Sequence, residues 1–150
     1  MVRHYWSKFT TLAGSQWAEA LTLLLARVSL AGIFWRSGRT KVEEGSWLSV
    51  SETTFFLFEE EYKGVPLPTE LAAYMATYAE HLFPILLVLG LATRLSALAL
   101  IGMTLVIQFF VFPEAWWAVH SLWVALGAIL VVRGAGIISA DHLLARSVQK

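Results

Sequence analysis

Four long apolar stretches restrict what this chain can fold into. A helix that crosses the hydrocarbon core of a bilayer needs about 20 mostly apolar residues. Four stretches meet this length, and they are residues 17–35, 71–92, 95–112 and 115–132. Only 15% of the residues are charged, whereas a soluble domain carries about 25%. Apolar and polar residues do not alternate with a period of two, so the sequence does not predict strands. The sequence therefore predicts an all-α membrane protein, an antiparallel four-helix bundle forming one domain over residues 1–150.

Short connections determine how three of the predicted spans follow one another. Residues 90–94 and 113–115 are too short to cross the bundle, so each must join antiparallel neighbours. We expect Gly90 to end the second span and Thr93 to cap the third. Thr69 is the expected cap of the second span. A short amphipathic helix is predicted to begin at residues 139–142.

The connection between the first two spans, residues 36–70, has a different character. It carries seven of the eleven acidic residues together with a cluster of aromatic side chains. We interpret residues 46–62 as an amphipathic element that lies on the membrane surface or over the mouth of the bundle.

The distribution of basic residues predicts the orientation of the chain. Six basic residues lie on the side of the two termini, and four lie in the loop after the first span. Cytoplasmic loops are enriched in Lys and Arg, so both termini are predicted to be cytoplasmic in a bacterial inner membrane. Residues 29–31 resemble a signal-peptide cleavage site, but Arg27 interrupts the apolar region that such a peptide requires. We therefore read residues 17–35 as a retained span.

Two charged side chains lie far from the ends of the predicted spans. Arg27 and Glu80 are each about ten residues from the end of their span on the side of the termini, which places both near the midplane. A charge at that depth costs roughly 2.5–3.5 kcal/mol unless it is paired or hydrated. We therefore predict an ion pair between Arg27 and Glu80. This pair either fixes the helix register alone or takes part in chemistry.

Further polar side chains are predicted to surround this pair. Thr77, Glu80, His81 and Pro84 share one helical face, as do Arg27, Ala31, Phe34 and Gly38, where small residues permit close approach. A second polar layer contains Gln108 and His120. Together these features predict a cavity that opens toward residues 36–70 and has Arg27 and Glu80 at its floor. The candidate site residues are Arg27, Arg36, Glu80, His81, Gln108, Trp116 and His120.

Each candidate also has a structural interpretation. His81 could bond to a carbonyl on the adjacent helix, Gln108 could join two helices, and Arg36 could anchor the chain at the interface. His120 could simply lie in the interfacial aromatic belt, although the ordinary pKa of histidine, about 6.5, also permits a role in proton transfer.

Several functional classes are not supported by the residue content. The chain has no cysteine, which excludes disulfides, thiolate metal sites and Cys-bound iron–sulfur clusters. Its four histidines are scattered along the chain, so no metal site is predicted. The formal net charge is zero, and no basic surface for nucleic acid is expected.

Three stretches resemble the DoxX family of membrane proteins, a group that includes the DoxD subunit of thiosulfate:quinone oxidoreductase. They are Arg27 with residues 34–41, Glu80 with residues 86–97, and residues 133–141. The resemblance implies a four-helix inner-membrane protein linked to quinone-coupled redox chemistry or to a membrane-tethered oxidoreductase complex. Residues 43–62 are longer and more acidic than the usual family loop.

Two functional hypotheses follow from the site and the resemblance. In the first, the chain is a membrane subunit of a quinone-linked complex, where Glu80 held by Arg27 relays protons and His120 and Gln108 bind the quinone headgroup. Electrons would come from a partner protein. In the second, the chain is a non-enzymatic scaffold that docks a periplasmic partner through residues 46–62. A transporter whose path is enclosed by a homodimer is a third hypothesis.

Overall fold

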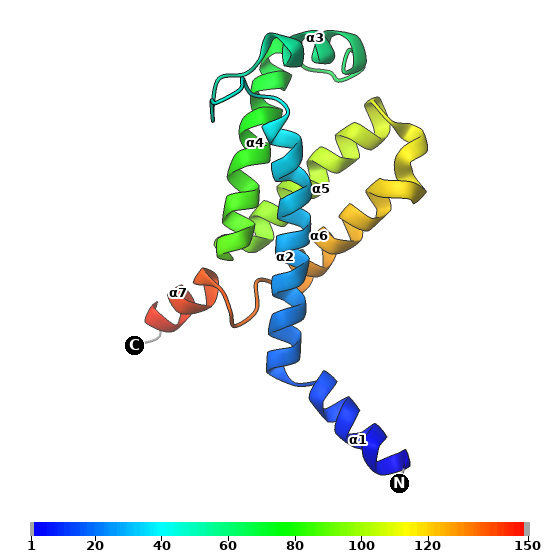
Figure 1. The fold of residues 1–150 in the computed structure, drawn as a ribbon, viewed down its shortest axis with the longest axis vertical. Helices are drawn as coiled ribbons and strands as arrows, with labels where there is room; N and C mark the ends of the chain where they lie inside the picture. Colours follow the sequence, from blue (N-terminus) through cyan, green and yellow to red (C-terminus); the bar gives the residue numbers. More distant parts are fainter. Residues whose placement is uncertain (1, 149–150) are drawn as a thin grey trace.

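The computed structural model describes residues 2–148, and these residues form a helical bundle (Figure 1). Its long helices are α2 (Gln16–Arg39), α4 (Thr69–Leu89), α5 (Thr93–Phe110) and α6 (Ser121–Arg133). Shorter helices are α1 (Val2–Ala13), α3 (Glu52–Glu61) and α7 (Ala140–Val148). Two short turns, η1 (Pro113–Ala115) and η2 (Trp116–His120), lead into α6.

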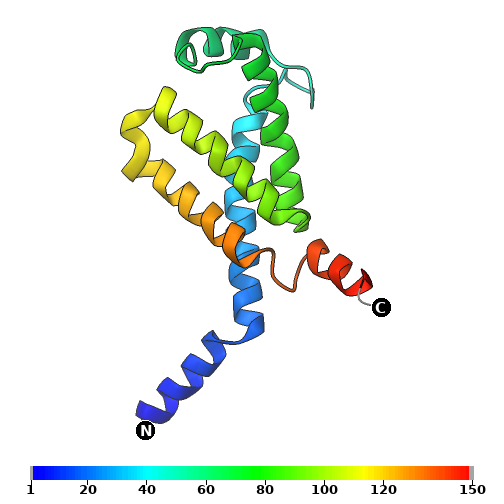
Figure 2. The same ribbon diagram turned by 180° about the vertical axis from the view of Figure 1, so that it is seen from behind.

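The long helices pack around α2, which contacts both α4 and α6, while α5 lies against α4 and α6. Helix α3 lies across the start of α4 at one end of the bundle, which we call the α3 end (Figures 1 and 2). Both chain ends lie at the opposite end, the termini end, together with the α4–α5 turn (Figure 2).

Within residues 2–148, four helical stretches are long and apolar enough to cross a membrane: α2, α4, α5 and residues 113–133. Large apolar side chains such as Leu25, Leu82 and Leu98 are exposed on the outer surface. The interior contains an apolar core with Leu30, Phe34, Leu87, Leu100 and Leu130, and it also buries several polar side chains. This distribution is expected where lipid surrounds the outer surface, and the predicted all-α membrane bundle is confirmed.

The helix ends are only partly those predicted. Gly90 ends α4 in the left-handed conformation with φ 68°, as expected for a helix terminus. Thr69 and Thr93 are not caps, because each is the first helical residue, after Pro68 and Ala92. The Asp141 carboxylate instead accepts hydrogen bonds from the backbone N–H groups of Ala92 (2.8 Å) and Thr93 (3.0 Å). The cap of α5 therefore comes from the start of α7, far along the chain.

The three short helices bring two confirmations and one addition. Helix α7 matches the C-terminal helix predicted from residue 139, and α3 lies within the predicted element at residues 46–62. No helix was predicted for α1. Its apolar side chains Tyr5, Trp6, Phe9 and Leu12 recur at helical spacing and are all exposed, which is typical of a helix at a membrane interface.

Candidate functional site

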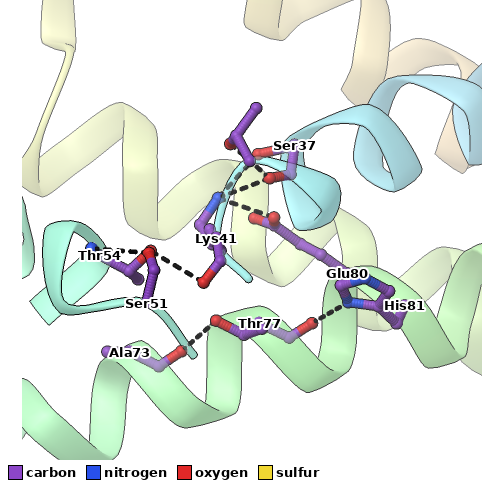
Figure 3. Close-up of polar contacts among 9 residues, drawn as sticks. Ser37, Lys41, Ser51, Thr54, Ala73, Thr77, Glu80 and His81 are labelled. Atoms are coloured by element: carbon purple, nitrogen blue, oxygen red, sulfur yellow. Dashed lines mark hydrogen bonds and ion pairs between the residues drawn. The ribbon is translucent and has the colours of Figure 1, made fainter. Parts of the chain in front are cut away.

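A buried ion pair joins the chain just after the end of α2 to α4, near the α3 end of the bundle. The Lys41 ammonium lies 2.8 Å from a carboxylate oxygen of Glu80, and the two side chains are 8% and 3% exposed. The same ammonium donates to the Ser37 hydroxyl at 2.8 Å, one turn earlier on the chain (Figure 3). An ammonium has three protons to donate, and these contacts keep it next to the Glu80 carboxylate.

The backbone of Lys41 attaches this pair to α3. The Lys41 carbonyl accepts hydrogen bonds from the Ser51 N–H at 3.0 Å and from the buried Thr54 hydroxyl at 2.9 Å. Ser51 is also the N-cap of α3, accepting from the Thr54 N–H (Figure 3). The beginning of α3 is thus fastened directly above the ion pair.

Gly38 allows α2 to approach α4 at this level. A Cβ atom added to Gly38 would lie 3.0 Å from the His81 ring and 3.1 Å from the Glu80 Cβ, which is tighter than ordinary van der Waals contact. The predicted faces of the two helices, including Phe34, Gly38, Thr77 and Glu80, are indeed buried against each other.

His81 lies beside the ion pair but points away from it. Its Nδ1 bonds to the Thr77 carbonyl at 2.7 Å on its own helix, not on the adjacent helix as its structural interpretation supposed. Its ring packs edge-on against Trp35 at a centroid distance of 5.2 Å. His81 lines none of the cavities described below, so its placement favours a structural role.

A second polar pair joins α5 to the turn that precedes α6. Gln108 donates from its amide nitrogen to the Pro113 carbonyl at 2.6 Å, and its amide oxygen lies 2.8 Å from His120 Nδ1. This confirms the predicted proximity of Gln108 and His120. The π-helical turn η2 carries His120. In a π-helical turn each backbone hydrogen bond joins residues five apart, instead of four apart as in an α-helix. Such turns are frequent at functional sites.

The contacts of Gln108 determine the tautomer of neutral His120. A backbone carbonyl only accepts, so the amide nitrogen of Gln108 must face Pro113 and its oxygen must face the imidazole. His120 Nδ1 therefore carries a proton and donates it to Gln108. In the neutral ring, Nε2 is left as a hydrogen-bond acceptor.

Glu80 and His120 line the same cavity, although they come from different spans. This cavity, which we call the polar cavity, has a volume of about 160 Å³. Its walls are Ile33, Phe34, Ser37, Tyr62, Glu80, Ile107, Phe112, His120 and Trp123. A cavity of roughly 150 Å³ is large enough to hold a benzene ring. The polar cavity therefore offers a ring-sized space with a carboxylate, two hydroxyls and an imidazole on its walls.

The predicted ion pair between Arg27 and Glu80 is wrong. Arg27 donates to the Ile138 carbonyl at 2.6 Å and lies beneath Gly90 at the termini end. Glu80 is ten residues before Gly90, about 15 Å along a helix axis. The prediction assumed that α2 and α4 reach the same depth at the termini end. In the structure, α2 extends further in that direction than α4 does. Arg27 is consequently not part of the cavity floor.

Three other candidates do not line the polar cavity: Arg36, Trp116 and Gln108, which contacts it only through His120. Arg36 is exposed on α2, and Trp116 packs against Trp117 in η2 rather than against the cavity. Trp123 forms the aromatic wall instead, with its ring centroid 5.2 Å from that of His120.

Lys41 was expected only near the mouth of the cavity and not as the partner of Glu80, and Ser37 and Tyr62 were not predicted as site residues. Lys41 continues the inward face of α2 at i+7 from Phe34 and i+3 from Gly38, and this spacing was the signal that could have identified it. No comparable pattern identifies Tyr62, because its position depends on the turn that follows α3.

Tyr62 places a phenol at the boundary between α3 and the polar cavity. It stacks on Phe58 at a centroid distance of 4.1 Å. Burial, followed by the charges of Glu80 and Glu61, raises the pKa of Tyr62 to about 12. The phenol is therefore neutral at physiological pH and available as a hydrogen-bond donor.

This elevated pKa predicts a loss of stability at alkaline pH. The folded pKa exceeds the unfolded value of about 10, so the contribution of Tyr62 is complete below pH 10 and disappears as the pH rises toward 12. The difference in tyrosinate absorbance between the parent protein and Tyr62→Phe should reveal this late titration. A midpoint at or below 10 would contradict the burial of the phenol. Glu80→Gln should lower the titration midpoint of Tyr62, because it removes the Glu80 charge that helps to raise the pKa of Tyr62.

The fold and the buried polar groups define a multi-pass helical membrane protein with a polar cavity between its helices. The DoxX family model matches residues 22–113, more than half of the chain. The chain belongs to the DoxX family. The matched region extends from α2 through α5, and includes Arg27, Lys41 and Glu80. It ends before His120 and Trp123.

Comparison with individual proteins adds little about activity. The chain is 29% identical to an uncharacterised protein of Haemophilus influenzae, and the match covers 84% of this chain and 85% of that protein. No solved structure matches the chain.

Proposed function

We propose that this DoxX-family protein is the membrane subunit of a redox-associated complex and binds a quinone headgroup in the polar cavity. The observation that carries the proposal is that Glu80 and His120, from separate spans, face one ring-sized space. Lipophilic ring compounds with two opposed oxygens suit a site with apolar walls and polar groups at defined positions. Trp123 and Phe34 supply the flat and apolar walls.

The hydrogen-bonding groups of the cavity suit the reduced form of such a ligand. Neutral His120 presents Nε2 as an acceptor, which matches a quinol hydroxyl, while the Tyr62 hydroxyl can donate to the opposite oxygen. Reduction of a quinone to this quinol takes up two protons and two electrons. In this proposal Glu80 and His120 relay the protons to the ring oxygens, and the redox centre of a partner protein supplies the electrons.

The cellular setting belongs to the same proposal. We infer a bacterial inner membrane with both termini on the cytoplasmic side. The support is the excess of basic residues at the termini end, which includes Arg3 and Lys8 on α1, together with Arg94 and Arg133 near the α4–α5 turn and the end of α6.

Quinone binding is tested on protein purified in a mild detergent. Mass spectrometry should detect a co-purifying quinone, and an added quinone should quench tryptophan fluorescence to saturation. His120→Phe retains a ring but removes the acceptor, so we expect about fivefold to tenfold weaker binding. His4→Phe, on exposed α1, is the matched control and should bind as the parent protein does. Absence of both a bound quinone and a saturable response would refute the proposal.

A second candidate function rests on the surface of the α3 end. Trp47, Leu48 and Phe56 are each more than 60% exposed, and Glu59, Glu60 and Glu61 are exposed beside them. This combination of aromatic and acidic groups supports a scaffold that docks a periplasmic partner. Trp47→Ser combined with Phe56→Ser should abolish cross-linking to that partner without unfolding the bundle. Unchanged cross-linking would count against docking at this surface.

A further inference from the structure

A second cavity lies between α4 and α5, beneath α3. Its volume is about 260 Å³, and we call it the apolar cavity. Its walls include Phe58 of α3, Met75, Ala76 and Phe83 of α4, and Met103 of α5. The polar side chains on its walls are Tyr62 and Glu80. A space of this character suits a hydrocarbon chain rather than a polar molecule.

The two cavities are neighbours. Tyr62, Glu80 and Ile107 line both of them, so these side chains form the partition between the spaces. On one side of the partition are Ser37 and His120, and on the other are the apolar walls of α4 and α5. A molecule with a polar ring and an apolar chain would match this arrangement, with its ring in the polar cavity and its chain in the apolar cavity.

The apolar cavity exists because α4 and α5 present small side chains to each other. Ala72, Ala76 and Ala79 of α4 face Ala99 of α5 around it. At its rim, Met75 and Val106 are 54% and 39% exposed on the outer surface of the spans. That surface faces lipid, and methionine adapts its shape readily to a passing ligand.

Aromatic side chains line the apolar cavity on the side of α3. Phe58 is 1% exposed and stacks on Tyr62, and both rings are part of the cavity wall. The hydrogen bonds of Ser51 and Thr54 to Lys41 hold α3 in this position.

We propose that the ligand of the polar cavity is a long-chain amphiphile that enters laterally from the bilayer between α4 and α5. Its ring lies between Glu80 and His120, and its chain remains in the apolar cavity. This inference rests on the proposed function, which it deepens by naming the class of ligand: a ring with hydroxyl or carbonyl oxygens that carries an isoprenoid-type chain. A water-soluble ring compound lacks the part that fills the apolar cavity.

The test compares two ligands, a benzoquinone with a decyl chain and the same ring without the chain, using quenching of tryptophan fluorescence. Affinities are expressed as mole fractions in the same detergent, so that partitioning into micelles is taken into account. Ala76→Phe fills the apolar cavity and should weaken binding of the decyl ligand about tenfold. Binding of the chainless ring should change little, because Ala76 does not line the polar cavity.

The matched control is Ala128→Phe, which adds the same ring to an exposed position on α6 and should leave both ligands unaffected. Met75→Trp, at the rim, repeats the test if Ala76→Phe fails to fold. Equal affinity of the two ligands for the parent protein, or equal weakening of both by the substitutions, would overturn lateral binding. If neither ligand binds the parent protein, the proposed function itself fails.

Discussion

Replacing Lys41 alone with methionine is expected to destabilise the bundle by about 3–5 kcal/mol. The substitution keeps the length of the side chain but leaves the Glu80 carboxylate buried without its cation. Removing one partner of a buried pair is costly because the remaining charge loses both its solvation and its attraction. Thermal unfolding in detergent, followed by helical circular dichroism, measures the loss.

The double variant Lys41→Met, Glu80→Gln should recover most of this stability. When both charges are absent, no unpaired charge is left buried. Replacing a whole buried ion pair therefore often changes the stability little. The double-mutant cycle should therefore show strong coupling. An exposed pair, Arg133 with Glu19, provides the matched cycle, and its coupling should stay below about 1 kcal/mol. Additive effects at Lys41 and Glu80 would contradict the structure.

The same double variant separates structure from chemistry at this site. If the folded double variant still binds and turns over quinone in membranes, the pair serves to hold α2 against α4. If it folds but loses the cellular function, the Glu80 carboxylate takes part in proton transfer. Glu80→Gln alone gives a less clear result, because it leaves the Lys41 ammonium buried without its carboxylate.

The four spans could be predicted because hydrocarbon imposes a simple condition on sequence. Each backbone group must be satisfied within its own helix, and the outer faces must be apolar. The inward faces were also predictable from spacing, as Thr77, Glu80 and His81 on one helix and Phe34 and Gly38 on the other show. Gln108 and His120 met as expected, because a short turn between two antiparallel helices fixes their relative depth.

The partner of Glu80 was missed because hydropathy reports where lipid contact ends and not where a helix ends. The apolar run stops near Trp35, but α2 continues to Arg39 and brings Lys41 over Glu80. The α1–α2 junction likewise lies beyond the end of α4, which shifts Arg27 to the level of Gly90. No short turn links α2 to α4, so nothing in the sequence fixed their relative depth.

The termini end shows a second limit on sequence reasoning. The Asp141 carboxylate caps α5 across 48 and 49 residues of chain, and Arg27 reaches Ile138 across 111 residues. These contacts depend on the chain reversal after α6, at Gly134 and Gly136, where both residues have φ 77°. The stretches that resemble the DoxX family at residues 27, 90–94 and 133–141 therefore meet at this end, away from the polar cavity.

Gly90→Ala is expected to be among the most damaging small substitutions in the chain. Gly90 has φ 68°, and an added Cβ would overlap the Arg27 guanidinium and lie 2.5 Å from the Ser139 Cβ. Arg27 is 1% exposed and bonded to Ile138, so it has little room to move. Backbone strain of about 1 kcal/mol and overpacking of about 1–3 kcal/mol together predict a loss of roughly 2–4 kcal/mol, measurable by thermal unfolding.

Gly45→Ala separates the two causes of this loss. Gly45 has φ 78°, but an added Cβ would meet nothing within 4 Å, so this variant carries the backbone strain without the steric clash. We expect it to lose about 1 kcal/mol, and the excess loss of Gly90→Ala then measures the contact with Arg27 and Ser139. Equal losses for the two variants would show that Arg27 does not lie beneath the α4–α5 turn. Combining Gly90→Ala with Arg27→Ala should cost less than the sum of the single losses, because truncating the guanidinium removes the nearest obstacle to the new methyl group.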